Sequence, residues 1–107
     1  MDRLEIIEAG PPKGGSTRPL LFVHGAFAGA WCWAENFLPY FASKGFRACA
    51  VSLSGHGGSH GRERLDWLSI GDYVRDLEQA VDSIGGDPVV VGHSMGGFVV
   101  QKYLESA

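Results

Sequence analysis

Residues 88–97 read Pro-Val-Val-Val-Gly-His-Ser-Met-Gly-Gly, and this stretch decides the fold. Three successive β-branched valines favour a strand, which runs into Gly92. Ser94 follows, with Gly92 two residues before it and Gly96 two residues after it. From Met95 onward, apolar residues recur at helical spacing. We interpret the stretch as a strand, a sharp turn centred on Ser94, and a helix.

A turn this sharp constrains its central residue. Such a backbone conformation costs of order 1–3 kcal/mol, and the neighbouring residues must lack side chains where strand and helix nearly touch. Gly-x-Ser-x-Gly between a strand and a helix is typical of a nucleophile elbow, which lifts the serine Oγ above the carboxyl edge of a sheet. An ordinary Gly/Ser turn fits the five residues alone, but the flanking strand and helix favour the elbow.

The composition limits the classes of partner. The chain has 107 residues, enough for one domain with a modest core, and a formal net charge of −3. It has no basic patch, so we expect neither nucleic acid nor an anionic membrane as a partner, and small neutral ligands remain open. Acidic residues near the start and the lack of a long apolar run predict a cytoplasmic protein. Cys32 and Cys49 lack CxxC spacing and are expected to be free, buried thiols.

Three further segments predict strands. Residues 19–23 form a continuous apolar run, which is typical of a strand covered on both faces in a parallel sheet, and it stops at His24 and Gly25. Residues 46–53 predict the next long strand, which ends in a glycine-rich loop over residues 54–61. A short strand within residues 4–9 precedes a turn-rich loop over residues 10–16.

Two segments between the strands predict helices. Residues 69–72, Ser-Ile-Gly-Asp, have the form of a capping box, and the apolar residues after them share one helical face until Gly85. The charged side chains of this helix are expected to face solvent; they are Arg75, Asp76, Glu78 and Asp82. Residues 28–44 also have helical spacing, but they contain Pro39, so regular helix is expected only from about Leu38, after an irregular aromatic turn.

The alternation of strands and helices predicts an α/β fold, with a mostly parallel sheet, right-handed crossovers and helices on both faces. Ligands of such sheets bind beyond the carboxyl ends of the strands. The glycine-bearing strand ends at residues 24–25, 54–57 and 92–94 are therefore expected to gather at one edge. The sequence shows no internal repeat, linker or second domain.

A serine hydroxyl at that edge needs two kinds of help to act as a nucleophile. A base must take its proton, and hydrogen-bond donors must already face the oxyanion that forms. The amide of Met95, first in the helix, is expected to donate there with support from the helix dipole. We expect a second donor amide from Ala26, in the loop after His24 and Gly25, where small residues let a carbonyl carbon come close.

Four motifs in this order make the sequence similar to the alpha/beta-hydrolase superfamily. They are LFVHGA at residues 21–26, WCW at 31–33, SGHGGS at 54–59 and VGHSMGG at 91–97, and the resemblance spans residues 20–104. It implies that Ser94 is the nucleophile and that the backbone amides of Ala26 and Met95 form the oxyanion hole. It also implies a small ester or related acyl substrate and no cofactor.

The resemblance extends to a branch of the superfamily. The His-Gly-Ala start with its nearby Trp-x-Trp looks most like the carboxylesterase and hydroxynitrile-lyase-like branch. A serine at the elbow argues against the dehalogenase and epoxide-hydrolase branches, because these attack through a carboxylate.

The sequence departs from the family at the catalytic partners. The family triad runs serine, acid, histidine along the chain, but only one acid, Glu105, and no histidine follow Ser94. Glu105 lies about 16 Å along the helix at 1.5 Å per residue, so the triad acid and histidine stay unknown. Ser52 also stands where the family usually has an aspartate, and we expect this change to be tolerated.

The four histidines of the chain are not expected to supply the base. His93 adjoins the nucleophile, but consecutive strand side chains point to opposite faces. His24 is expected to be a packed structural residue, and His56 and His60 are expected to be solvated on their loop. Their spacing predicts no metal site.

The missing catalytic partners shape the expected function. We expect residues 1–107 to be the amino-terminal part of a single alpha/beta-hydrolase domain that lacks the C-terminal strands, with little or no turnover alone. Residues 89–91 would then form an unpaired apolar edge, which invites self-association. The leading hypothesis is an esterase-like serine hydrolase that acts through an acyl-enzyme on Ser94. The alternatives are a non-catalytic small-molecule-binding or regulatory module and a lyase of the same fold.

Overall fold

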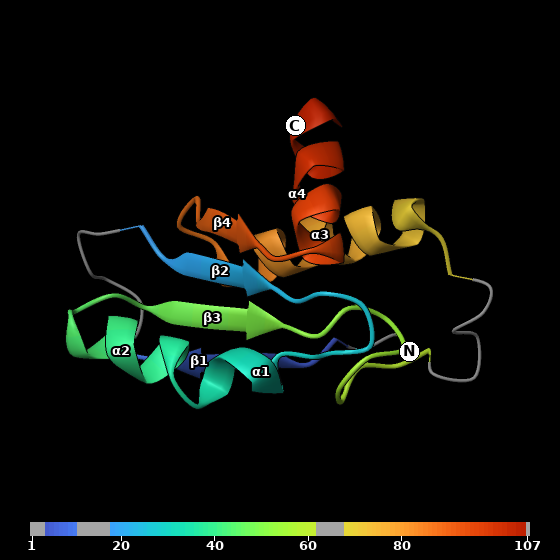
Figure 1. The fold of residues 1–107 in the computed structure, drawn as a ribbon. Coiled ribbons are helices and arrows are strands. Elements are labelled where there is room, and N and C mark those ends of the chain that lie inside the picture. The colour runs from blue at the N-terminus through green and yellow to red at the C-terminus, as the bar shows by residue number, and fades with distance from the viewer. Residues whose placement is uncertain (1–3, 11–17, 62–67, 107) are drawn as a thin grey trace.

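A computed structural model of the protein describes residues 4–10, 18–61 and 68–106. Strands and helices alternate along these residues (Figure 1). The elements are β1 (Ile6–Ala9), β2 (Leu20–Val23), α1 (Trp31–Ala34), α2 (Phe37–Ser43), β3 (Ala48–Val51), α3 (Ile70–Ile84), β4 (Val89–Gly92) and α4 (Met95–Ser106). Apart from the short helix α1, this is the predicted order of elements, and most of the predicted loop over residues 10–16 lies outside the described residues.

The four described strands form one sheet in the order β1-β3-β2-β4. β2 pairs in parallel with β3 and β4, with Phe22 opposite Ala50 on one side and Val91 on the other. β1 runs antiparallel to β3, with Ile6 opposite Val51. The carboxyl ends of β2, β3 and β4 therefore share one edge of the sheet, and the first residue of β1 lies at the same edge. The predicted mostly parallel sheet is confirmed.

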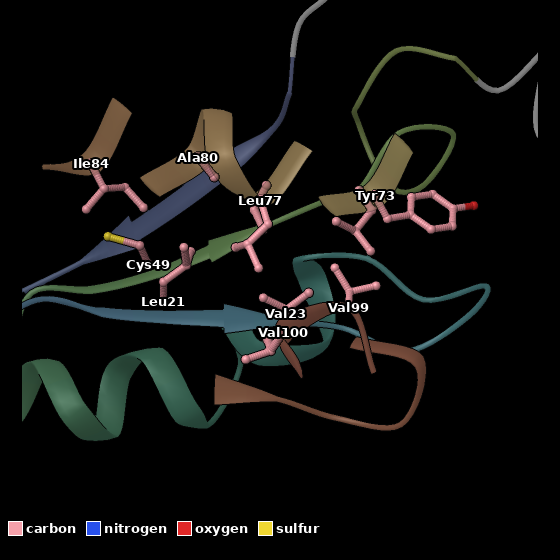
Figure 2. Close-up of a cluster of buried hydrophobic side chains, with 11 residues drawn as sticks. Leu21, Val23, Cys49, Tyr73, Leu77, Ala80, Ile84, Val99 and Val100 are labelled. Atoms are coloured by element: carbon pink, nitrogen blue, oxygen red, sulfur yellow. The ribbon is translucent and has the colours of Figure 1, made fainter. Parts of the chain in front are cut away.

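Helices cover both faces of the sheet, as predicted. In Figure 1, α3 and α4 lie on one face, and α1 and α2 lie on the other. Because strand side chains alternate between faces, Leu21 and Val23 pack toward α3 and α4, while Phe22 packs toward α1 and α2. Figure 2 shows the larger of the two clusters, where Leu77 of α3 and Val99 of α4 meet the strand side chains. Each fully buried leucine or valine contributes about 1.5–3 kcal/mol to folding.

The start of α3 confirms the predicted capping box. The Ser69 Oγ accepts the Asp72 backbone N–H at 3.2 Å, and the Asp72 carboxylate accepts the Ser69 backbone N–H at 2.8 Å. These two bonds satisfy amides that have no partner within the helix. The helix continues to Ile84, and Gly85 ends it with φ 69°, a backbone conformation that favours glycine.

Pro39 lies inside α2 without breaking it. The helix begins at Phe37, so Pro39 falls in its first turn, where a backbone N–H would have no partner within the helix. The short helix α1 precedes it, in place of the irregular aromatic turn that the sequence predicts. Regular structure therefore begins earlier than predicted, at Trp31, while the second helix begins close to the predicted Leu38 and ends just before Gly45.

The two cysteines differ in burial. Cys49 on β3 is buried, and burial together with a hydrogen bond from its Sγ to the Glu8 carboxylate raises its pKa to about 12. Cys32 is exposed, which corrects the prediction that both thiols are buried. In α1 the neighbouring Trp33 turns toward the sheet, so the adjacent Cys32 side chain is left on the outer side. None of the described helices is long and apolar enough to cross a lipid bilayer.

Candidate active site

Ser94 lies at a strained turn between β4 and α4. Its φ is 58°, in the left-handed region that residues with a side chain rarely adopt. The backbone around it is tightly bonded, because the Gly96 N–H donates to the His93 carbonyl and the Gly97 N–H donates to the Ser94 carbonyl, each at 2.9 Å. Ser94 is nevertheless exposed. The strand, sharp turn and helix predicted for this stretch are present, and backbone strain of this kind is concentrated at functional positions in proteins.

The two glycines that flank Ser94 are required by close backbone contacts. A Cβ on Gly92 would lie 2.5 Å from the Gly96 carbonyl oxygen, and a Cβ on Gly96 would overlap the carbonyl oxygens of Val23 and His24. The strand β4, the helix α4 and the end of β2 therefore meet with no room for a side chain. The spacing Gly-x-Ser-x-Gly follows from this crowding.

The loop after β2 passes directly beside Ser94. A Cβ on Gly25 would lie 3.2 Å from the Ser94 Cβ and 3.4 Å from the His93 carbonyl oxygen. Ala26 follows Gly25 and is exposed, and Met95 follows Ser94 as the first residue of α4. The two predicted donor residues therefore belong to the two backbone segments that flank the Ser94 side chain.

His24 holds that loop in place from below. It is fully buried, and its Nε2 accepts the Leu53 backbone N–H at 2.9 Å. Since Nε2 accepts, the neutral ring carries its proton on Nδ1, which donates to the Gly25 carbonyl at 2.6 Å. Burial is the main cause that lowers the pKa of His24, so the ring stays neutral. The prediction of a packed structural histidine is confirmed.

His56 is buried, which corrects the prediction that it is solvated. Its ring lies 4.9 Å from the ring of His24 and 5.8 Å from that of Tyr73, measured between centroids. The loop over residues 54–61 folds back onto α3. It can do so because its backbone turns sharply at three glycines with positive φ, which are Gly55, Gly57 and Gly61. His60 is half-buried, with its Nε2 3.4 Å from the Ser54 Oγ.

Asp76 is also buried, which corrects the prediction that its side chain faces solvent. Its carboxylate accepts the Ser54 backbone N–H at 2.8 Å and the Ser54 hydroxyl at 2.9 Å. Burial raises the pKa of Asp76, against the opposite effect of these hydrogen bonds. A signal for its burial was present in the sequence, because Asp76 stands three residues after Tyr73 and four before Ala80, on the face that packs against the sheet.

The described residues bring no base to Ser94. Within residues 4–10, 18–61 and 68–106, the Ser94 hydroxyl makes no hydrogen bond to a histidine or a carboxylate. His93 packs edge-on against Trp33, with ring centroids 6.4 Å apart, and Glu105 lies 3.5 Å from the Lys102 ammonium near the end of α4. Across the same described ranges, no three His, Cys, Asp or Glu side chains are grouped closely enough to hold a metal ion.

Known proteins resemble this chain over most of its length. The model of a family described as the alpha/beta hydrolase family matches residues 20–106. Methylesterase 3 of Arabidopsis thaliana is 38% identical over 88 residues, which cover 80% of this chain and 33% of the relative. Methyl jasmonate esterase 1 of Vitis vinifera is 37% identical over 91 residues, covering 82% and 34%. Norfluorocurarine synthase 1 of Strychnos nux-vomica is 37% identical over 88 residues, covering 79% and 32%.

Solved structures share the fold. The thioesterase domain from the curacin biosynthetic pathway superposes with a TM-score of 0.84 at 24% identity, over 98% of this chain and 38% of that domain. The epoxide hydrolase VrEH1 from Vigna radiata superposes with a TM-score of 0.80 at 25% identity, over 95% and 32%. The chain spans about a third of the length of the curated relatives it matches.

Proposed function

Because the chain belongs to the alpha/beta hydrolase family, we propose that it is the amino-terminal part of a single-domain serine esterase in which Ser94 is the nucleophile. The observation that carries this proposal is the strained, exposed Ser94 between β4 and α4. Two relatives that are 38% and 37% identical to this chain are named methylesterase 3 and methyl jasmonate esterase 1. These names support a carboxylic ester as the substrate class.

The proposed reaction begins when the Ser94 Oγ attacks the ester carbonyl carbon and gives its proton to a base. The carbonyl oxygen becomes an oxyanion, which accepts hydrogen bonds from the backbone amides of Ala26 and Met95. The Met95 amide lies at the amino terminus of α4, where the helix dipole favours negative charge. One donor of this kind typically contributes about 2.7–4 kcal/mol to transition-state stabilisation.

The oxyanion then collapses and the C–O bond to the alcohol breaks, with the alcohol taking the proton from the base. The acyl group stays on Ser94 as an ester until water attacks it in the same way and releases the acid. Each half-reaction consumes and returns one proton, so the proposed chemistry needs no cofactor.

The base is the missing part of the proposed machinery. In the 107 residues, Glu105 is the only acidic residue after Ser94, and no histidine follows Ser94. The upstream histidines His24 and His56 are buried in structural roles. The relatives are about three times as long as the stretch that matches. We therefore propose that the triad acid and histidine come from outside these residues, and that residues 1–107 alone turn over little substrate.

A second candidate keeps the fold and changes the reaction. A relative at 37% identity is named norfluorocurarine synthase 1, a name that does not state ester hydrolysis. The name favours an enzyme of the same fold that catalyses a reaction other than hydrolysis, such as a lyase. It favours this alternative over a non-catalytic binding or regulatory module.

A fluorophosphonate probe, which reacts with activated serines, tests the proposal on the 107-residue chain. We expect slow labelling at high probe concentration, with mass spectrometry locating the probe on Ser94 and labelling lost in Ser94→Ala. The matched control is Ser43→Ala, which removes another exposed hydroxyl and should leave labelling unchanged. Equal labelling of Ser43 and Ser94 contradicts the nucleophile assignment, and rapid labelling of Ser94 contradicts the missing base.

A further inference from the structure

Glu5 reaches the candidate active-site edge because of the direction of β1. The residue immediately precedes β1, and β1 is the one described strand that runs antiparallel to its neighbour. Its first residues therefore lie beside the carboxyl end of β3. The Ser52 backbone N–H donates to the Glu5 carbonyl at 2.9 Å, which extends the pairing by one step beyond Ile6 and Val51.

The Glu5 carboxylate joins two loops of that edge. Its Oε1 accepts the Ser52 hydroxyl at 2.7 Å and the Gly58 backbone N–H at 2.8 Å. The Ser52 Oγ in turn accepts the backbone N–H of Ala30, the residue before α1, at 2.9 Å. The directions are fixed, because an amide can only donate and an ionised carboxylate can only accept. The Ser52 hydroxyl therefore links the Glu5 carboxylate to the Ala30 amide, and we call this hydrogen-bonded chain the relay.

The glycines at positions 57 and 58 leave room for the side chains of Glu5 and Ser52. A Cβ on Gly57 would lie 2.7 Å from the Glu5 Oε1 and would overlap the Ser52 Oγ, and a Cβ on Gly58 would lie 2.8 Å from the Glu5 Oε2. The Ser59 hydroxyl adds a second connection, accepting the Glu5 backbone N–H at 2.7 Å and donating to the Ser52 carbonyl at 2.5 Å.

The Ala30 amide connects the relay to the backbone segment that passes beside Ser94. Ala30 and Ser52 are both fully buried, so without the Ser52 Oγ the Ala30 N–H would be an unpaired buried donor, which is unfavourable. Ala30 closes the segment of residues 25–30 that begins beside Ser94. The end of this segment is therefore held by Ser52 and Glu5, just as its beginning is held by His24.

We propose that Glu5 is a positioning residue, whose ionised carboxylate holds the loop of residues 25–30 through Ser52 and holds the loop of residues 54–61 through Gly58. It does not touch the Ser94 side chain. The consequence for an oxyanion donor at Ala26 rests on the proposed function, but the relay itself does not.

The charge on Glu5 is protected by its partners. Its pKa is lowered first by the hydrogen bond from Ser52 and then by that from Gly58, against the opposing effect of burial. The other titratable groups nearby have partners of their own: His56 packs on His24 and Tyr73, His60 lies beside the Ser54 Oγ, and Glu8, at the far end of β1, pairs with Arg47 at 2.5 Å.

The test is a titration of backbone amides by nuclear magnetic resonance, on the 107-residue chain from pH 7 down to pH 3. We expect the Gly58 and Ala30 amide resonances to shift with one shared midpoint below the ordinary pKa of glutamate. In Glu5→Gln this shared shift disappears. In Ser52→Ala the Gly58 amide still titrates and the Ala30 amide does not. The matched control Glu8→Gln, a carboxylate removed from the same strand, leaves both titrations in place.

Two outcomes contradict the relay. One is an Ala30 amide that does not follow Gly58 in the unsubstituted chain, and the other is an Ala30 amide that still titrates in Ser52→Ala. Hydrogen exchange at pH 7 gives an independent measurement. Ser52→Ala should speed exchange of the Ala30 amide by about fivefold to tenfold, the effect of one net hydrogen bond, and Glu8→Gln should not. Neither experiment depends on Ser94, so its result is separate from that of the probe labelling.

Discussion

The Nε2 of His24 accepts the backbone N–H of Leu53 at 2.9 Å, and this bond ties the end of β2 to the end of β3. The same ring donates from Nδ1 to the Gly25 carbonyl. A buried neutral histidine therefore joins the loop beside Ser94 to the neighbouring strand, and it can do so only in one tautomer. The relationship gives the histidine before Gly25 a structural role.

Replacement of His24 by phenylalanine should lower the free energy of unfolding by about 1–3 kcal/mol at pH 7.5, since the buried Leu53 amide loses its acceptor. Urea unfolding of the 107-residue chain measures this. The control His93→Gln alters an exposed histidine and should change stability by less than about 0.5 kcal/mol. Equal effects of the two substitutions would argue against the structural role of His24.

The pKa of His24 also predicts a pH dependence. Because the folded pKa is lowered, the unfolded chain binds a proton at about pH 6.5 while the folded chain does not. Stability should therefore fall as the pH decreases from about 6.5 toward the folded pKa, and this loss should be smaller in His24→Phe. Urea unfolding at a series of pH values measures the difference, and identical profiles for both proteins would contradict it.

Asp76 offers the opposite sign of pH dependence. Its folded pKa is raised, so above the ordinary pKa of about 3.9 the folded chain keeps a proton that the unfolded chain has lost. This group therefore lowers stability as the pH rises through that window, and Asp76→Asn should remove its contribution. Asp76→Ala should instead cost about 1–3 kcal/mol, because the buried Ser54 amide loses its acceptor. The exposed Asp82 on the same helix serves as control, with Asp82→Ala expected to have little effect.

The crowding at Gly96 predicts a large effect from a single methyl group. A Cβ there would overlap the carbonyl oxygens of Val23 and His24, so Gly96→Ala should destabilise by more than about 1 kcal/mol as the backbone shifts. Gly71→Ala in α3 is the matched control. Its Cβ would meet only the Ser69 Oγ at 3.5 Å, and alanine should stabilise the helix by up to about 1 kcal/mol. Thermal unfolding of both variants measures the change in stability. An unchanged unfolding temperature in Gly96→Ala would contradict the prediction.

The outer edge of β4 predicts self-association. The amide of Val89 donates to the carbonyl of Pro19, just before β2, and that of His93 donates to the carbonyl of Val23. The alternate residues Val90 and Gly92 therefore present their amides to the open side. Val91 is 38% exposed, and β4 carries no charged side chain. We expect two copies to pair through β4, and Val91→Lys to weaken that pairing because a charge on an edge strand opposes it.

Light scattering after size-exclusion chromatography measures this association. The mean mass should fall toward that of a monomer in Val91→Lys. Gln79→Lys, the same added charge on the exposed side of α3, should not change it. A monomeric unsubstituted chain at all concentrations would remove the basis of the prediction.

Local sequence was sufficient to predict the turn at Ser94, the capping box of α3 and the strand that leads into the turn. These features depend on neighbouring residues, since glycine spacing, β-branched runs and the Ser69–Asp72 pair act within a few positions of the chain. The family could also be inferred from motifs that are each at most seven residues long.

The burial of His56, the hydrogen-bond partner of Asp76 and the reach of Glu5 to the candidate site were decided by the tertiary structure alone. Ser54, 22 residues before Asp76, folds back to meet it. Glu5 meets Ser52, 47 residues later, because β1 runs against β3. The neighbours of Asp76 and Glu5 in the sequence do not show which distant groups donate hydrogen bonds to these carboxylates. Only the pairing of distant strands and loops supplies these hydrogen bonds.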